Sequence, residues 1–375
     1  MLITDLNDDE LIIIFSYCTE SDHKQLVRTC NLFEKLIEDN FFERKCRPFL
    51  MVSHMKAHPE VFERTLNGYM KYSERIKTHQ NWMYGTCRQI VFFQHRENYE
   101  SLLELDSNYL YTTALGQFNL FKRRRKDGID TDPILSIGDK NDSKIASLKR
   151  RDYMIAGCRL SGTIFTYDEE NEYNEEFVRD SIDPLLDLDF VGDFFVTTSR
   201  RDTIFHKLSC ELGMYTFDFS KNLNIGFNSI DINPLCDKIL GAKSDSLHII
   251  EPVKALVSNS YLNRAQIYNT KWLNNNSFVF TSNTNPLCLI DTRDFKRQEF
   301  SCGNFSATSV DYDGNNGLIY GTLLGMIILC DIRMPRTFEK VFHLDTPAIC
   351  RNVKSDERHL YISTDNAIHM LNFDY

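Results

Sequence analysis

Residues 317–333 read GLIYGTLLGMIILCDIR, and this stretch decides the fold. Two apolar runs of strand length, 318–320 and 326–329, flank Gly325, which can adopt a positive φ. The pattern predicts a β-hairpin. Because an isolated two-stranded hairpin is marginally stable in water, this unit is expected to pack against neighbours built in the same way.

The same hairpin turn occurs seven times along the chain. Small or polar residues lead into each turn, and Gly, Asp or Asn stands where left-handed backbone is expected. Successive turns are 46, 40, 43, 40, 40 and 41 residues apart, a period typical of β-propeller blades with four short strands each. The sequence therefore predicts an all-β seven-bladed propeller over residues 87–375. The turn residues are Gly116, Gly162, Asp202, Asp245, Asn285, Gly325 and Asn366.

The last repeat predicts only three strands, at about 348–353, 359–363 and 367–373. One strand-like stretch, 89–94, lies unassigned before the first blade. We expect residues 89–94 to pair as the outer strand of the last blade. This pairing would join the two ends of the ring and remove open sheet edges.

Composition and charge argue against several classes of function. The formal charge of −10 over 375 residues disfavours a general nucleic-acid binder, because phosphate contacts need a basic surface. The acidic opening segment lacks signal-peptide features, and no apolar run reaches the ~18 residues of a membrane span. Eleven cysteines, an odd number, are expected to be reduced thiols. The predicted location is the cytoplasm, with the nucleus as a second possibility.

No catalytic motif is found in the sequence. His-Glu-x-x-His, Gly-x-Ser-x-Gly, the Walker loop and Gly-x-Gly-x-x-Gly are all missing. The close pair His54 and His58 has no further metal ligands nearby. Asp187 and Asp189 alternate on a predicted strand, and we interpret them as solvated or turn-bonding acids. The sequence predicts a non-enzymatic protein with no metal and no cofactor.

Residues 1–50 have the pattern of three short helices. Asn7 and Glu10 have the spacing of a capping box ahead of the apolar run 11–15. Ser21 or Asp22 can cap a second helix, and Asn31 can open a third. The large apolar side chains exceed what so small a core can take, and an exposed apolar patch usually marks a partner surface. These side chains are Leu6, Leu11, Ile14, Phe15, Leu26 and Phe33.

This spacing resembles an F-box, the helical motif that docks on the Skp1 adaptor of cullin-based ubiquitin ligases. The resemblance covers about Ile3 to Phe49 and implies a small all-α domain over residues 1–50. F-boxes usually place Pro directly after the first Leu; here Asn7 follows it, which puts one apolar contact in doubt. The alternative is a plain three-helix domain packed on the propeller. The implied Skp1-binding residues are Leu6, Leu11, Ile14, Phe15, Leu26, Cys30 and Phe33.

Residues 51–86 are predicted to form a helical linker. After the helix-breaking pair His58-Pro59, apolar residues at helical spacing predict a helix over about 60–74. A semi-rigid linker would fix the distance between the two ends, and a flexible tether is the alternative. Asn81-Trp82, followed by Gly85 and Cys87, resembles the dactylin-like branch of F-box/WD-repeat proteins.

The propeller is similar to the WD-repeat family in its spacing, but its signature is incomplete. Asp291 and Asp331 stand where that family has Trp-Asp, and the Trp is missing. The turns between the second and third strands place four cations on one face: Arg159, Arg200, Arg201 and Lys243. Such a cluster suits an acidic or phosphorylated peptide, because guanidinium groups bind carboxylate and phosphate in bidentate fashion. Turns also commonly carry charges for solvation alone.

These features lead to one functional prediction. The chain is expected to be the substrate-recognition adaptor of an SCF (Skp1-cullin-F-box) ubiquitin ligase, binding Skp1 and through it a cullin. Its propeller would hold a protein substrate. The alternatives are a propeller scaffold without ligase function and a propeller hydrolase. The basic run Lys122–Lys126 is interpreted as a solvated loop rather than a nuclear import signal.

Overall fold

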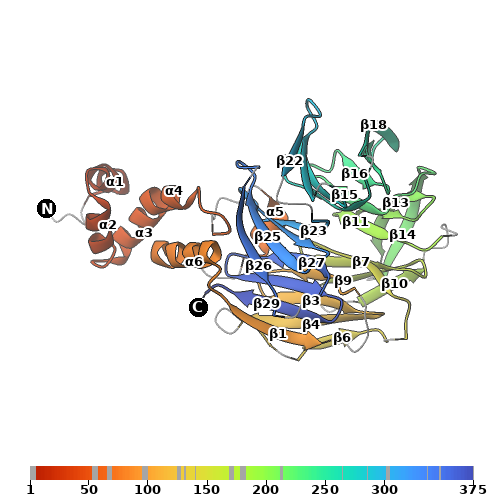
Figure 1. Cartoon of the computed structure of the whole chain (residues 1–375), viewed down its shortest axis with the longest axis horizontal. Coiled ribbons are helices and arrows are strands. Elements are labelled where there is room, and N and C mark those ends of the chain that lie inside the picture. The colour runs from red at the N-terminus through yellow and green to blue at the C-terminus, as the bar shows by residue number, and fades with distance from the viewer. Residues whose placement is uncertain are drawn as a thin grey trace.

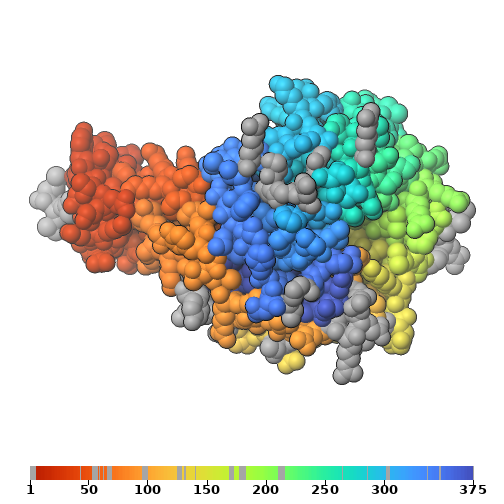
Figure 2. Space-filling view, in the orientation of Figure 1, coloured from red at the N-terminus to blue at the C-terminus, as the bar shows by residue number. Residues whose placement is uncertain are grey.

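The computed structural model describes residues 6–52, 58–65, 70–94, 100–124, 128–130, 132–139, 141–168, 173–177, 183–211, 214–263, 265–284, 286–300, 305–335, 337–345 and 348–374. A small helical unit lies at one end of the molecule and a ring of seven sheets at the other (Figure 1). Helix α6 bridges the two, and the helical unit projects from the ring (Figure 2). None of the described helices is long and apolar enough to cross a membrane.

The helical unit comprises α1 (Asp8–Ser16), α2 (Glu20–Leu26), α3 (Asn31–Ile37), the π-helical η2 (Glu38–Phe42) and α4 (Glu43–Cys46). The expected capping box forms, because Asn7 accepts a hydrogen bond from the Glu10 backbone N–H at 2.9 Å and Glu10 accepts one from Asn7. The second helix is capped by Thr19, with Asp22 as its reciprocal partner, rather than by Ser21 or Asp22. These caps fix where the short helices begin.

The connector differs from the single predicted helix. Helix α5 (Pro59–Glu63) is one turn long, and α6 (Tyr72–Tyr84) is a separate helix that ends at Gly85 with a φ of 73°. The prediction of one helix over about 60–74 is therefore wrong. The physical reason is that Arg64, directly after α5, is bound to Asp311 of the propeller, as described below.

Each propeller sheet has four strands in sequence order, running from the axis outward, except at the two ends of the ring. Blade 1 contains β2 (Leu103–Leu105), β3 (Tyr109–Ala114) and β4 (Gln117–Arg124), which pairs with both β5 (Gly128–Ile129) and β6 (Leu135–Ile137). Blade 2 contains β7 (Ile145–Arg151), β8 (Met154–Arg159), β9 (Thr163–Asp168) and β10 (Tyr173–Phe177). Blade 3 contains β11 (Asp187–Val191), β12 (Phe194–Thr198), β13 (Thr203–Glu211) and β14 (Met214–Asn222).

The second half of the ring follows the same plan. Blade 4 contains β15 (Ser229–Ile232), β16 (Ile239–Ala242), β17 (Ser246–Glu251) and β18 (Leu256–Leu262). Blade 5 contains β19 (Ile267–Trp272), β20 (Ser277–Ser282), β21 (Leu287–Asp291) and β22 (Arg297–Phe300). Blade 6 contains β23 (Ala307–Tyr312), β24 (Gly317–Thr322), β25 (Met326–Asp331) and β26 (Phe338–His343). Blade 7 contains β27 (Cys350–Ser355), β28 (His359–Thr364) and β29 (Ala367–Asn372).

The outer strand of blade 7 comes from the other end of the propeller sequence. Strand β1 (Arg88–Gln94) pairs antiparallel with β29, from Arg88 opposite Asn372 to Gln94 opposite Ala367. This strand contains the stretch 89–94 that was expected to take this place. The pairing closes the ring without an open edge at the junction.

The hydrophobic core is divided among the gaps between blades. Seven apolar clusters each join two neighbouring blades, so every blade is packed on both sides. An eighth cluster, which includes Leu11, Phe15 and Phe33, holds the helical unit together. The cluster between blades 6 and 7 also takes in Met51 and Trp82 of the connector. The connector is thus part of the propeller core.

Only some of the seven turns have the backbone predicted for them. Gly162 and Gly325 adopt φ values of 93° and 74°, as expected. In the first turn the left-handed residue is Leu115, with a φ of 56°, instead of Gly116. The Asn285 turn residue lies outside the described residues. Glycine geometry therefore accounts for two of the hairpins.

Side-chain hydroxyls replace left-handed backbone in two other turns. Asp202, Asp245 and Asn366 do not have a positive φ, so the expectation of left-handed geometry there is wrong. The Ser199 hydroxyl accepts backbone N–H groups of its turn at 3.1 and 3.2 Å, and the Thr364 hydroxyl does the same at 3.1 and 3.4 Å. These bonds are typical of Ser/Thr turns.

Candidate functional site

The inner strand of every blade points alternate side chains at the propeller axis, because strand side chains alternate with a period of two. Two stacked rings result, each with one residue per blade. The upper ring consists of Leu102, Ser147, Asp187, Ser229, Asn269, Ser309 and Asn352. The lower ring consists of Glu104, Lys149, Asp189, Asp231, Lys271, Asp311 and Lys354.

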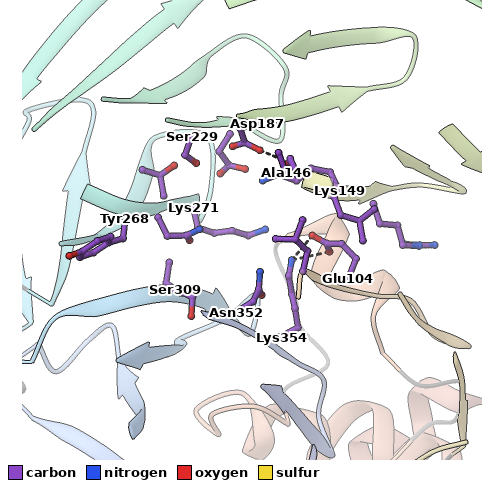
Figure 3. Close-up of a pocket in the computed structure, with 18 of the residues that line it drawn as sticks. Glu104, Ala146, Lys149, Asp187, Ser229, Tyr268, Lys271, Ser309, Asn352 and Lys354 are labelled. Carbon is purple, nitrogen blue, oxygen red and sulfur yellow. Dashed lines mark hydrogen bonds and ion pairs between the residues drawn. The ribbon is translucent and has the colours of Figure 1, made fainter. Parts of the chain in front are cut away.

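The lower ring is an almost regular alternation of charges. Going from blade to blade, acid and lysine alternate, and Lys354 forms an ion pair with Glu104 at 2.8 Å (Figure 3). Since seven is odd, one pair of like charges must be neighbours, and this pair is Asp189 and Asp231. The Arg151 guanidinium lies 2.7 Å from Asp189 and 4.0 Å from Asp231, where it offsets their repulsion.

The acids of both rings also join neighbouring blades. Asp187 and Asp189 accept backbone N–H groups of β15 at 2.8 and 2.6 Å. Asp231 accepts one from β19 at 2.6 Å, and Asp311 accepts one from β27 at 2.8 Å. The interpretation of Asp187 and Asp189 as solvated or turn-bonding acids is therefore wrong, because both are buried ties between blades.

Helix α5 and the following Arg64 lie at one end of the channel that runs along this axis. We call α5 and Arg64 the channel plug. Glu60 forms ion pairs with Lys271 at 2.7 Å and with Arg151 at 2.8 Å. Arg64 bonds both carboxylate oxygens of Asp311, at 2.7 and 2.8 Å, and both side chains are buried. The plug therefore completes the charge pairing of the lower ring with groups from the connector.

The pKa values of the ring residues follow from this pairing. Burial alone would raise the pKa of Glu60, but Arg151 and Lys271 hold it well below its usual range. Burial likewise opposes ionisation of Asp311, and the Arg64 guanidinium keeps the pKa of Asp311 lowered. Asp231 differs, because burial and the nearby Asp189 outweigh Lys271 and Lys149 and raise its pKa to about 6. Asp231 therefore gains a proton more readily than Asp311.

Above the plug lies a cavity of about 290 Å³ with polar walls. Its lining includes Lys149, Asp187, Ser229, Tyr268 and Asn352 (Figure 3). Among the described residues, no group of three or more His, Cys, Asp or Glu side chains could hold a metal ion. The cavity wall is mostly polar, and some of its groups, such as Asp187 and Asp231, already serve the contacts between blades.

Not all of the four cations predicted to lie on one face of the propeller are exposed. Arg159 is buried, and its guanidinium donates to Glu175 at 2.5 Å and to the Gly116 carbonyl at 2.7 Å. Arg200, Arg201 and Lys243 are exposed on the turns of the neighbouring blades 3 and 4, and Arg201 pairs with Asp183 at 3.2 Å. Three cations therefore remain on the surface.

The Arg200 turn is held by a close backbone approach at Gly226. A Cβ atom at Gly226 would come 2.2 Å from the Arg200 carbonyl carbon and 2.3 Å from the Ser199 carbonyl oxygen. Any larger residue must displace that turn. Gly226 thus positions the exposed cations although it carries no side chain itself.

The basic run Lys122–Lys126 contains a buried structural residue. Arg123 is buried, forms an ion pair with Asp356 and donates to the Arg64 carbonyl at 3.0 Å. The interpretation of this run as a solvated loop is therefore wrong for Arg123, because the Arg123 side chain links blade 1, blade 7 and the connector. Lys122 and Arg124 are exposed at the end of β4, and Arg125 and Lys126 lie outside the described residues.

The residues implied to bind Skp1 divide between core and surface. Leu11, Phe15 and Phe33 are buried in the helical core, and Leu6, Leu26 and Cys30 are half-buried against it. Ile14 is exposed. The largest exposed apolar side chains of the unit are Ile13 (60%), Ile14 (39%), Tyr17 (86%) and Leu32 (37%). We call these four residues the apolar patch of the helical unit.

Sequence reasoning missed three members of this patch, Ile13, Tyr17 and Leu32. Ile13 lies on α1, and Tyr17, four residues later, is the C-cap of that helix, so the two share a face away from Leu11 and Phe15. A helical projection of residues 8–17 would have found this second apolar face. The charge rings were missed as well, although aligning the seven repeats at their inner strands displays charged residues at the same position in each.

Trp82 anchors α6 to the propeller. Its ring stacks on Phe373 with centroids 3.7 Å apart, and its indole N–H donates to the Glu357 carbonyl at 2.9 Å. Asn81 donates to the Phe373 carbonyl at 2.8 Å. At its other end α6 meets the helical unit, where Tyr72 stacks on Phe42 at 4.0 Å. Helix α6 therefore contacts both the helical unit and the propeller.

The arrangement of the sheets is that of a seven-bladed β-propeller. A similar solved structure is described as the crystal structure of the WD40 β-propeller domain of Doa1. The TM-score is 0.60 at 12% identity, and the match covers 76% of this chain and 97% of that chain. At this identity the likeness shows the fold alone. No protein-family model matches the chain, and the search of curated proteins found no similar sequence.

Proposed function

We propose that this chain is the substrate-recognition adaptor of an SCF ubiquitin ligase. Its helical unit binds Skp1, and its propeller binds a protein substrate. The observation that carries the proposal is the apolar patch of the helical unit, whose four large side chains lie in water on a unit that projects from the ring (Figure 2). Large exposed apolar side chains on so small a unit are typical of a partner surface.

The proposed contacts with Skp1 are revised by burial. Ile14 contacts Skp1 directly, together with Ile13, Tyr17 and Leu32. Leu11, Phe15 and Phe33 support that surface from the core, and Leu6, Leu26 and Cys30 lie at its margin. Asn7, which stands where F-boxes usually have Pro, serves as a helix cap and keeps α1 in place.

The docked connector supports a positional role in ubiquitin transfer. Trp82, Asn81 and the channel plug all fix the connector to the propeller. A substrate on the propeller is then held at a set distance from whatever the helical unit binds. Such positioning raises the effective concentration of a substrate lysine near a charged conjugating enzyme, without a catalytic residue in this chain.

The proposed substrate surface is the face carrying Arg200, Arg201 and Lys243. These three exposed cations suit an acidic or phosphorylated segment of a protein substrate. Arg159, the fourth cation of the original set, contributes indirectly, because its bonds to the Gly116 carbonyl and Glu175 hold neighbouring backbone in place.

The test is affinity purification of the full chain from cells, compared with the Ile14→Asp variant. Skp1 and a cullin should co-purify with the unmodified chain and be lost with Ile14→Asp, because a carboxylate cannot enter an apolar contact without a partner. Leu324→Asp is the matched control, since Leu324 is an exposed leucine on the propeller. Absence of Skp1 from the unmodified chain would favour a propeller scaffold without ligase function.

A further inference from the structure

The charged side chains along the propeller axis do not balance. Matched one to one, the ion pairs of the lower ring and the plug, including Glu63 with Arg150 at 2.6 Å, account for all but three charged residues of the two rings and the plug. The three are Asp187, Asp231 and Lys149. Two acids and one base leave one uncompensated negative charge in the interior at neutral pH. Such a charge costs free energy unless another charge offsets it.

The pKa values of these residues agree with an excess of negative charge. Burial alone would lower the pKa of Lys149, but Asp187 and Asp189 outweigh burial and raise it, so Lys149 stays charged. Even beside this ammonium group, burial and Asp189 raise the pKa of Asp231 to about 6. A carboxyl group that holds its proton so readily lies where a further positive charge is favourable.

The cavity above the channel plug has room for a ligand that carries this charge. Both Asp187 and Asp231 line it, and its volume of about 290 Å³ far exceeds the roughly 30 Å³ of one water molecule. Leu102 and Ala146 add apolar surface to the wall. The exposed Asn228 also lines the cavity, so a ligand can enter from solvent.

Uncharged oxygen atoms complete the wall of the cavity. Ser229, Asn269 and Asn352 come from blades 4, 5 and 7, and their side chains form no hydrogen bond with any residue that the structure describes. Each side chain carries an oxygen that can accept a hydrogen bond from an ammonium group. Figure 3 shows Ser229 and Asn352 on different sides of the cavity. Several acceptors therefore surround the space next to the acids.

From these observations we propose that the axial cavity binds a small primary amine. Its ammonium group lies near Asp187 and Asp231 and donates to the neighbouring side-chain oxygens, while a short alkyl chain contacts Leu102 and Ala146. The size of the cavity favours such a ligand over a bare metal ion. The site is independent of the proposed ligase role, because it involves neither the apolar patch nor the exposed cations. We expect a dissociation constant on the order of 0.1 mM.

The test is calorimetric titration of the full chain at pH 7.5 with n-butylammonium chloride. Butanol and sodium butyrate are the neutral and anionic probes of similar size. Butylammonium should bind at one site per chain, and the other two should not. Asp231→Asn should weaken this binding about 10-fold or more, because it removes the uncompensated charge. Asp193→Asn is the matched control: Asp193 is an exposed acid in a turn of blade 3, so affinity should not change.

Proton release gives a second measurement on the unmodified chain. At pH 6 an ammonium group beside Asp231 should lower the pKa of Asp231 and release protons, which titrations in buffers of different ionisation enthalpy detect. Asp231→Asn should release none. The charged groups that face Asp231 are Asp189, Lys149, Arg151, Lys271 and Glu60.

Three results would overturn the proposal. The first is no binding of butylammonium by the unmodified chain up to about 10 mM, 100 times the expected dissociation constant. The second is equal affinity for butanol or butyrate, or for the Asp231→Asn variant. The third is displacement of butylammonium by potassium chloride but not by choline chloride at equal ionic strength, because that would make the site one for a metal ion.

Discussion

Arg64 shows how one side chain joins the connector to the channel. It is buried and is bonded to both oxygens of a buried carboxylate, Asp311. Removing one partner of a buried ion pair leaves an uncompensated charge in a low-dielectric site. Arg64 therefore matters for folding of the propeller, although it lies outside every predicted blade.

The corresponding prediction concerns Arg64→Met. This change keeps the approximate length of the side chain but removes the guanidinium partner of the buried Asp311 carboxylate. We therefore expect a loss of about 3 to 5 kcal/mol in the free energy of unfolding. Urea unfolding followed by tryptophan fluorescence measures it. Arg293→Met is the control: its pair with Asp291 is solvent-exposed, so its unfolding midpoint should not change. Equal effects of the two variants would contradict the role given to Arg64.

Two acids of the lower ring should respond to pH with opposite signs. The pKa of Asp311 is lowered in the fold, so its ionised form stabilises the protein above about pH 4, and that stability is lost as pH falls further. The pKa of Asp231 is raised to about 6, so the stability linked to its protonated form is lost as pH rises from about 4 through 6.

The prediction compares Asp311→Asn and Asp231→Asn at pH 4.5 and 7.5. Asp311→Asn should be clearly less stable than the unmodified chain at both values. For Asp231→Asn, the free energy of unfolding relative to the unmodified chain should rise by about 1 to 3 kcal/mol between pH 4.5 and 7.5. The reason is that Asp231 must ionise in the folded unmodified chain over this range, whereas Asn has no proton to lose. Thermal unfolding at both pH values measures this. A pH-independent difference for Asp231→Asn would refute the raised pKa.

Among the secondary-structure elements, α6 decides whether the two parts of the molecule keep one arrangement. Trp82→Ala should remove the stacking on Phe373 and the hydrogen bond to the Glu357 carbonyl. The expected cost is about 3 to 5 kcal/mol for a fully buried Trp. Limited proteolysis should then cut the chain near Gly85 faster. Tyr84→Ala, an exposed position on the same helix, should leave the cleavage rate as it was.

The elements with local sequence signals could be predicted, and those fixed by distant contacts could not. The hairpin at Gly325 and the capping box at Asn7 and Glu10 depend on neighbouring residues, and both form as predicted. The channel plug depends on a contact between Glu60 and Lys271, which are 211 positions apart and have no shared local pattern. Such a pairing cannot be predicted from the sequence because the two residues are far apart along the chain.

The candidate site was predicted only in outline for the same reason. The exposed turn positions of Arg200, Arg201 and Lys243 follow from the blade pattern. Burial of Arg159 does not, because it depends on Glu175 in the outer strand of the same blade and on the Gly116 carbonyl of blade 1. A position in a turn therefore predicts an exposed side chain only when no residue of the same or the neighbouring blade contacts that side chain.

At the scale of the whole molecule, the cation face and the helical unit should act independently. Arg200→Ala, Arg201→Ala and Lys243→Ala combined should weaken the capture of substrate proteins and flatten its salt dependence, because charged contacts are screened by salt. The amount of Skp1 bound should not change. Quantitative affinity purification at low and high salt checks both. Lys254→Ala, which removes an exposed cation from another turn, is the control.

The central claim is that the apolar patch binds Skp1, and calorimetric titration of purified Skp1 into the full chain tests it most directly. We predict saturable binding at one site per chain. Ile14→Asp should weaken binding about 30-fold or more, the effect of losing a central contact residue, and Leu324→Asp should leave it unchanged. Absence of measurable binding by the correctly folded, unmodified chain, or equal affinity for Ile14→Asp, would contradict the assignment.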